Sequence, residues 1–167
     1  MEIRYLSEAD DRLAVSGIYE ASWKYVYRDI LPRDYLESIP AGRWAFRLDG
    51  GERTTLVMLE EGRYIGTSSC CASRFPEFDG WGEIVSLYLL PEYMGRDFGK
   101  PLLEAAVAAL AGQGYRDVFL WVLEENRRAR AFYEKMNFQL SGARRADVIG
   151  GKTVREAAYC RVDSARR

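Results

Sequence analysis

Residues 86–104 of the chain read SLYLLPEYMGRDFGKPLLE. The segment opens with an apolar run that ends at Pro91, as a buried β-strand does, and passes two glycines, Gly95 and Gly99. Apolar residues at 102, 103, 106, 107 and 110 then predict a helix over residues 99–110. Free backbone N–H groups and the positive end of the helix dipole meet at such a strand-loop-helix junction, so the segment suits an anion.

The loop does not match the common phosphate-binding patterns. Gly95 and Gly99 enclose three residues where a P-loop has four, and Lys100 is followed by Pro101 instead of Ser or Thr. The dinucleotide pattern G-x-G-x-x-G is also absent from this loop. From these residues alone, phosphate binding and a helix start that uses glycine for close packing remain open alternatives.

Working outward from the junction, hydrophobic periodicity predicts the remaining elements. Helices are expected from near residue 10, at 32–39 and at 127–136, and strands at 3–6, 54–59, 63–73, 81–90, 118–123, 138–147 and 153–162. Glu61-Gly62 and Gly150-Gly151 are typical of tight hairpins. The order β-α-α-β-β-β-α-β-α-β-β predicts an α/β (α+β) fold with a mixed sheet, antiparallel hairpins at both ends and a crossover in the middle.

The start of the first helix is indicated by Ser7, with Asp10 three residues later as a capping partner. Helical spacing then predicts an apolar face for this helix made of Leu13, Ile18, Ala21 and Tyr25.

Length and charge limit the partners. A chain of 167 residues is expected to form a single domain over 1–167. Lys plus Arg number 24 against 25 for Asp plus Glu, so no overall positive field is available to hold nucleic acid. The longest aliphatic stretch is far shorter than the ~20 residues that span a bilayer, so no membrane partner is expected. The start of the chain lacks the basic and apolar regions of a signal peptide, which favours a cytoplasmic location.

The chain has no histidine and three cysteines, Cys70, Cys71 and Cys160. This composition excludes Ser-His-Asp and Cys-His chemistry and predicts neither a disulfide framework nor a metal site. Any general base must therefore be Asp, Glu, Lys, Tyr or a water molecule.

Two blocks of the sequence resemble the GNAT superfamily of acetyl-CoA-dependent N-acetyltransferases. Residues 86–104 are similar to its acetyl-CoA motif Q/R-x-x-G-x-G/A, and residues 126–138, NRRARAFYEKMNF, resemble its second signature. The resemblance covers roughly residues 53–162 and departs from the motif at Met94 and Asp97, where the family has Gln or Arg and Gly. It implies a mostly antiparallel sheet of about seven strands flanked by about four helices.

The same resemblance implies acetyl transfer from acetyl-CoA, as co-substrate, to a primary amine of a small molecule or peptide in a ternary complex. Tyr133 would be the general acid for the leaving thiolate and Glu83 the water-linked general base, facing the same way as Leu87 by strand alternation. The N–H of Leu89 would meet the thioester carbonyl. Cofactor binding would involve Leu87, Tyr88, Leu89, Met94, Gly95, Arg96, Asp97, Phe98, Gly99, Lys100, Asn126, Phe132 and Tyr133.

Several alternatives stay open at this point. The strand residues and Tyr133 are also ordinary core residues, the cations also ordinary surface groups, and Glu83 also a salt-bridge partner. The acceptor site could be ringed by Trp23, Tyr27, Phe75, Glu77, Asp79 and Trp81. A silent acyl-CoA-binding sensor or scaffold, and an O-acyl transferase or ligase, are the competing functions. The acceptor, the acyl-chain preference and the oligomeric state, a homodimer included, are left open.

Overall fold

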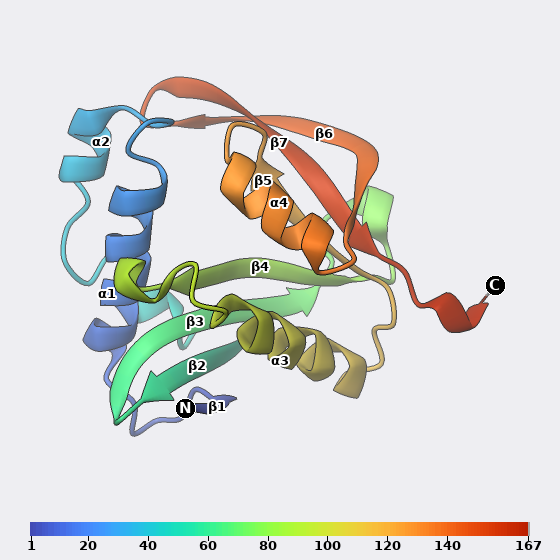
Figure 1. Cartoon of the computed structure of the whole chain (residues 1–167), viewed down its shortest axis with the longest axis horizontal. Coiled ribbons are helices and arrows are strands. Elements are labelled where there is room, and N and C mark those ends of the chain that lie inside the picture. The colour runs from blue at the N-terminus through green and yellow to red at the C-terminus, as the bar shows by residue number, and fades with distance from the viewer. Residues whose placement is uncertain (167) are drawn as a thin grey trace.

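The strand that precedes the glycine loop lies at the centre of a seven-stranded sheet in the computed structural model, which describes residues 1–166 (Figure 1). The strand order is β1-β2-β3-β4-β5-β7-β6. Only β4 and β5 pair in parallel, and the other neighbours are antiparallel. The strands are β1 Glu2–Tyr5, β2 Thr54–Glu60, β3 Arg63–Ala72, β4 Gly82–Leu89, β5 Val118–Leu123, β6 Gln139–Ile149 and β7 Lys152–Arg161.

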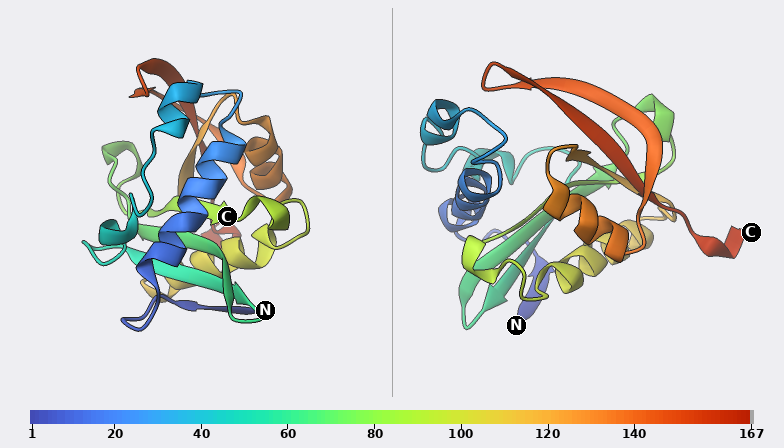
Figure 2. Two further views of the ribbon diagram at one scale, coloured as in Figure 1. Left: turned by 90° about the vertical axis from the view of Figure 1, so that its left-hand side faces the viewer. Right: turned by 45° about the horizontal axis from the view of Figure 1, so that its top comes forward.

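Four helices cover the two faces of this sheet, as the predicted element order requires. Helices α3 and α4 lie on one face and α1 and α2 on the other (Figures 1 and 2). Their bounds are α1 Arg12–Val26, α2 Arg33–Glu37, α3 Gly99–Gly112 and α4 Arg127–Lys135. Short 3-10 turns occupy Ala45–Arg47, Pro76–Phe78, Pro91–Tyr93 and Ser164–Arg166. The fold class and the element order are confirmed. No helix within residues 1–166 is long and apolar enough to cross a membrane.

Helix α3 forms the centre of the main core. Leu102, Leu103, Ala106 and Leu110 are fully buried against the sheet, as their spacing predicted. Gly82 at the start of β4 makes this packing possible, because a Cβ there would lie only 2.9 Å from a methyl group of Leu110. The sheet and α3 are thus locked together where β4 begins.

The predicted cap of the first helix is wrong, and of its predicted apolar face only Ile18 is buried. Asp11 is the N-cap, and its carboxylate accepts hydrogen bonds from the N–H groups of Leu13 and Ala14. Leu13 and Tyr25 are exposed, because the buried face begins two residues later. That face consists of Val15, Ile18, Tyr19 and Ser22.

Asp10 does not cap the first helix; its side chain connects the start of this helix to strands β1 and β3. Its carboxylate accepts two hydrogen bonds of 2.7 Å from the Arg4 guanidinium and one of 2.6 Å from Tyr64. The Arg4 guanidinium holds the pKa of Asp10 well below its usual value, and the bonds from Tyr64 and Ser7 act in the same direction. The side chain is almost completely buried, so a charged partner is required.

The β6–β7 hairpin forms one edge of the sheet, and its tip reaches α2 and the segment before it (Figure 2). Gly150 and Gly151 both have positive φ, 60° and 80°, as the predicted hairpin requires. The ring of Tyr35 packs so closely that a Cβ on Gly150 would lie 2.5 Å from it. Lys152 also donates a hydrogen bond of 2.6 Å to the carbonyl of Ile30. The hairpin therefore forms a wall above the diverging ends of β4 and β5.

The Asp10→Asn substitution is expected to lower the free energy of unfolding by about 1.5–3 kcal/mol at pH 7, since hydrogen bonds to a charged group are lost. Because the native state depresses the pKa of Asp10, its contribution is fully present above about pH 4, the range of an unfolded aspartate. The contribution declines as the pH falls toward the lowered native pKa. Urea unfolding of both proteins across this range measures the difference. The Asp11→Asn control keeps a capping oxygen and should change stability little.

Candidate active site

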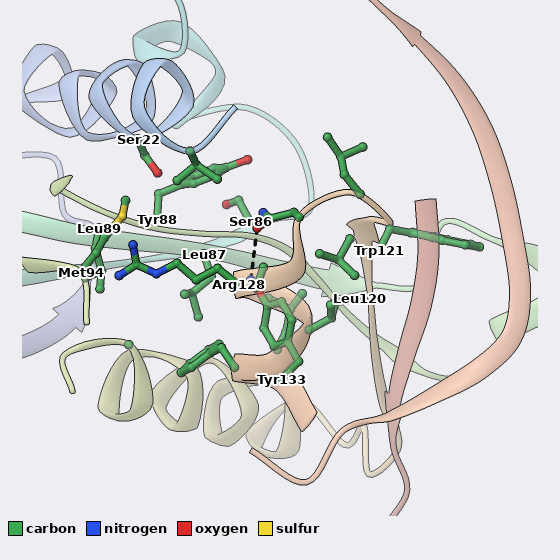
Figure 3. A pocket seen from close by; sticks show the side chains of 18 of the residues that line it. Ser22, Ser86, Leu87, Tyr88, Leu89, Met94, Leu120, Trp121, Arg128 and Tyr133 are labelled. Carbon is green, nitrogen blue, oxygen red and sulfur yellow. Dashed lines mark hydrogen bonds between the residues drawn. The ribbon is translucent and has the colours of Figure 1, made fainter. Parts of the chain in front are cut away.

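The two central strands separate soon after they pair. Gly82 pairs with Val118 and Glu83 with Phe119, and no further register pair joins β4 to β5. The strands diverge from there, and a cleft of about 690 Å³ opens between them. The cleft is lined by β4, β5, the end of α1, the start of α3 and helix α4 (Figure 3).

The divergence leaves one edge of β4 facing the cleft. Leu90 donates its N–H to the carbonyl of Ile65 in β3. Because successive backbone groups of an extended strand point to opposite edges, the N–H of Leu89 points away from β3, toward the open side. The backbone N–H of Leu87, two residues earlier, points to the same open side. This edge can hydrogen-bond an extended ligand as a further strand would.

The glycine loop turns the chain sharply at one end of the cleft. Gly95 has φ 73° and Asp97 φ 63°, so both adopt the left-handed conformation that glycine adopts most easily. Helix α3 begins after Phe98, a residue whose side chain has no oxygen to cap the first N–H groups. The amide groups at this helix start are therefore open to an anion, in accord with the phosphate-binding interpretation.

Both glycines also sit against side chains of α4. A Cβ on Gly99 would lie 3.2 Å from the Phe132 ring, and one on Gly95 would lie 3.1 Å from the guanidinium of Arg128. Arg128 reaches along the cleft toward Met94 and Leu89 in Figure 3. Lys100 lines the same end. Two cations and a helix N-terminus thus gather where the loop bends, with the Asp97 carboxylate beside them.

Tyr133 of α4 lies in the floor of the cleft and is 9% exposed. Burial raises its pKa, and the nearby Tyr88 hydroxyl raises it further, so the phenol keeps its proton at neutral pH. Asn126 caps α4 by accepting a hydrogen bond of 3.1 Å from the N–H of Ala129. This cap fixes the helix that carries Phe132 and Tyr133.

The opposite wall is aromatic and comes from α1. Tyr88 contacts Tyr19, with ring centroids 4.9 Å apart, and Trp23 contacts Tyr27 at 5.0 Å. The hydroxyl of Tyr19 lies 3.2 Å from Oγ of Ser86. Burial raises the pKa of Tyr27, and Tyr133 and Glu156, which line the same cleft, raise it further.

Glu83, expected as the water-linked general base, is instead bound by Arg74. Its carboxylate accepts bonds of 3.0 and 2.6 Å from the Arg74 guanidinium and one of 3.2 Å from the Arg74 N–H. It is 1% exposed and is not among the residues that line the cleft.

Glu83 and Leu87 do not share a face of β4, contrary to the prediction from strand alternation. Glu83 lies opposite Cys71 of β3 and Leu87 opposite Ser68. Residues 68 and 71 are three apart in a regular strand, so Glu83 and Leu87 point to opposite faces. The register shift at Ser69/Cys70 creates this change, because Val85 is an extra residue in β4.

Most of the other predicted cofactor residues lie along the cleft. The structure brings together Leu87, Tyr88, Leu89, Met94, Gly95, Asp97, Gly99, Lys100, Asn126, Phe132 and Tyr133. Arg96 and Phe98 stay outside it: the Arg96 guanidinium stacks over the rings of Tyr93 and Phe98. Of the proposed acceptor ring, Trp23 and Tyr27 line the cleft, whereas Phe75, Glu77, Asp79 and Trp81 do not.

The lining residues that the sequence did not reveal include Trp121, Arg128, Asp147 and Glu156. Glu156 carried a detectable signal, because it shares a strand face with Val154 and Ala158, where alternation favours an apolar residue. Asp147 likewise shares the inward face of β6 with Arg145 and Ile149. Charged residues on inward strand faces indicate a site, since their burial is costly without a partner.

Comparisons with known proteins agree with this geometry. The Acetyltransferase (GNAT) family profile matches residues 15–138. An uncharacterized N-acetyltransferase of Bacillus subtilis, YuaI, is 27% identical over 154 residues, which cover 85% of this chain and 87% of that protein. The spermidine N(1)-acetyltransferase of Thermoplasma acidophilum is 26% identical over 153 residues, covering 89% and 94%.

Solved structures show the same fold. The PaiA N-acetyltransferase of Thermoplasma acidophilum in complex with coenzyme A superposes with a TM-score of 0.71 at 24% identity, covering 93% of this chain and 96% of that one. A GCN5-related N-acetyltransferase of Rhodopseudomonas palustris gives a TM-score of 0.74 at 20% identity, covering 96% and 94%. These likenesses concern the overall fold.

Proposed function

Because the chain belongs to the acetyltransferase (GNAT) family, we propose that it moves an acetyl group from acetyl-CoA to a primary amine of a small molecule or peptide, by direct attack in a ternary complex. The observation that carries the proposal is the cleft between β4 and β5, which joins an anion-binding loop, an open strand edge and a buried tyrosine. The spermidine acetyltransferase among its relatives supports an amine acceptor.

The residues around the cleft suit acetyl-CoA in two parts. The open edge of β4 at Leu87 and Leu89 would bond the amide groups of the pantetheine arm as an added strand. The N–H groups at the start of α3 would hold the pyrophosphate, with Lys100 and Arg128 supplying positive charge. The close contacts of Gly95 and Gly99 with α4 indicate why side chains are disfavoured in this cradle.

When bound, acetyl-CoA supplies an acetyl group activated as a thioester. The N–H of Leu89 would stabilise negative charge on the carbonyl oxygen during attack. Tyr133 would hold a proton at its hydroxyl for the departing sulfur, and its raised pKa keeps that proton in place until it is needed. The surrounding rings of Tyr88, Tyr27 and Phe132 limit the access of water to the reacting carbonyl.

Acetyl-CoA is expected to raise the melting temperature, because a ligand that binds only the native state stabilises it by about 2.7 kcal/mol at 100 times Kd. Differential scanning fluorimetry measures the shift, and a thiol reagent measures CoA release with a panel of amines. A shift without CoA release would favour the silent sensor. CoA release with alcohols alone would favour O-acyl transfer, and no shift at millimolar acetyl-CoA would refute the assignment.

The Tyr133→Phe substitution keeps the ring and removes the proton donor. We expect kcat to fall roughly 10²-fold, whereas the affinity for acetyl-CoA changes little. Steady-state kinetics and calorimetric titration measure the two quantities separately. The Phe132→Leu control alters the packing beside Gly99 and should affect affinity more than kcat. Full activity of Tyr133→Phe would assign the tyrosine a packing role alone.

Replacement of Asp97 is expected to tighten acetyl-CoA binding in the order Gly, then Asn, then the natural Asp. A carboxylate ~6 Å from a phosphate costs from below 1 to about 3 kcal/mol, depending on the effective dielectric constant. Glycine also removes the strain of φ 63°, roughly 1 kcal/mol for an ordinary residue and less for Asp or Asn. Calorimetry at two salt concentrations measures both effects, and the gain from Asn should shrink at high salt. Weaker binding in both variants would show instead that the Asp97 side chain supports the turn.

A further inference from the structure

We propose that Glu156 of β7, rather than Glu83, is the general base that takes a proton from the amine acceptor, within an acidic pocket completed by Asp147. This inference rests on the proposed function, since it assigns the acceptor end of the same cleft. It identifies the acceptor as an amine that arrives as an ammonium ion.

The position of Glu156 fits this role. It lies opposite Leu123 of β5, the last residue of the strand that diverges from β4, and it lines the cleft. Its side chain is 18% exposed, so it is accessible and yet largely shielded. Tyr27, Tyr133 and Glu156 all line the cleft, so the proposed base and the proposed acid face one space.

The bonding of the two glutamates differs. Arg74 donates three hydrogen bonds to Glu83, and these bonds occupy both of its carboxylate oxygens. Glu156 has one close cation, Arg145, whose Nε lies 2.9 Å from Oε2. Among residues 1–166, no group donates a hydrogen bond to Oε1 of Glu156. That oxygen is available to an N–H group of the acceptor.

The charges at this end favour a cation. Arg145 is shared between Glu156, at 2.9 Å, and Asp147, at 3.6 Å, so two carboxylates face one guanidinium. The Arg74–Glu83 pair is neutral as a whole. Two carboxylates therefore share one guanidinium on the acceptor wall, where the rings of Trp23, Tyr27 and Trp121 can also contact an ammonium ion; Lys135 of α4 is a further cation that lines the cleft.

An unpaired donor is present on the same wall. The indole Nε1 of Trp121 is buried and donates to no other group within the described part of the chain. The Trp121 ring is fixed by Phe75, with centroids 5.4 Å apart, and by the Arg145 guanidinium at 5.7 Å. The Trp121 N–H therefore has no exposed surface, and the ring contributes packing and an aromatic face to this wall.

The groups around Glu156 also adjust its basicity. Burial raises the pKa of Glu156 above the usual value for glutamate; the Arg145 and Arg74 guanidinium groups oppose this shift, and Asp147 adds to it. A raised pKa brings the carboxylate closer to neutral pH, where a general base is most effective. Tyr27, which follows the last residue of α1, and Lys135 of α4 line the same cleft, and the raised pKa of Tyr27 keeps its hydroxyl uncharged at neutral pH.

The proton balance is complete with these two residues. One proton passes from the ammonium ion to Oε1 of Glu156, and the freed nitrogen lone pair forms the C–N bond as the C–S bond breaks. The sulfur takes the Tyr133 hydroxyl proton. The second nitrogen proton then restores Tyr133, and Glu156 releases its proton to solvent, so each turnover yields an amide, a thiol and one proton.

The test compares pH profiles of kcat/KM for the wild type and for Glu156→Gln, Glu83→Gln and Glu61→Gln, using alaninamide and spermidine as probes. Glu61 is an exposed hairpin residue and controls for the loss of one carboxylate. In the wild type, activity should rise as Glu156 loses its proton. In Glu156→Gln, kcat/KM near pH 7 should fall about 10²-fold and recover only toward the pKa of the amine itself, ~8 for an α-amine.

The pH at which the acidic limb of the kcat/KM profile lies distinguishes a general base from a residue that only supports the structure. Asp147→Asn removes the charge that raises the Glu156 pKa, so the acidic limb of the profile should move to lower pH. Glu83→Gln and Glu61→Gln should keep that limb, and all variants should keep the acetyl-CoA melting shift. An unchanged acidic limb in Glu156→Gln, or its loss in Glu83→Gln alone, would overturn this inference only. Absence of both shift and turnover in the wild type would overturn the proposed function together with it.

Discussion

The separation of β4 from β5 is the constraint on which the rest of the structure depends. The two strands meet at only two register pairs, and Gly82 lets α3 press against the sheet at that junction. Beyond it, the N–H of Leu89 and the groups at Leu87 have no strand partner on the β5 side. An unsatisfied buried backbone group costs about 1–3 kcal/mol, so this edge favours a ligand that can pair with it. The helices, the glycine loop and the hairpin all enclose this one opening.

Sequence patterns predicted a helix or strand correctly where the pattern was compatible with only one structure. Helix α3 follows from apolar spacing and flanking glycines, and β5 from a continuous apolar run, so both were found at or close to their observed bounds. The start of α1 was misplaced because Asp10 and Asp11 can both accept hydrogen bonds from a helix start. Only Arg4 and Tyr64, which lie on other elements, decide that Asp10 is used elsewhere.

The dependence on contacts between distant segments also explains which parts of the site could be predicted. The glycine loop is contiguous in sequence, so its residues could be predicted as one group, and Asp97 was singled out because it stands where the family has glycine; its positive φ agrees with that position. The extra residue Val85 was not foreseen, because a bulge is defined by the pairing of β4 with β3 and has no signature in β4 alone. The acceptor wall combines α1, β5, β6 and β7, and no single stretch of sequence contains it.

The net charge of the chain does not reveal how positive and negative side chains are distributed along the cleft. The chain as a whole carries only −1, which excludes a strong overall field. Within the cleft, however, Lys100 and Arg128 lie at the helix start, whereas Asp147 and Glu156 lie on the hairpin wall. Fixed charges in a partly buried site act over short distances at low effective dielectric, so their local arrangement outweighs their sum. A polyanionic co-substrate and a cationic acceptor would therefore enter from different ends, and their reactive groups would meet between these ends, beside Tyr133.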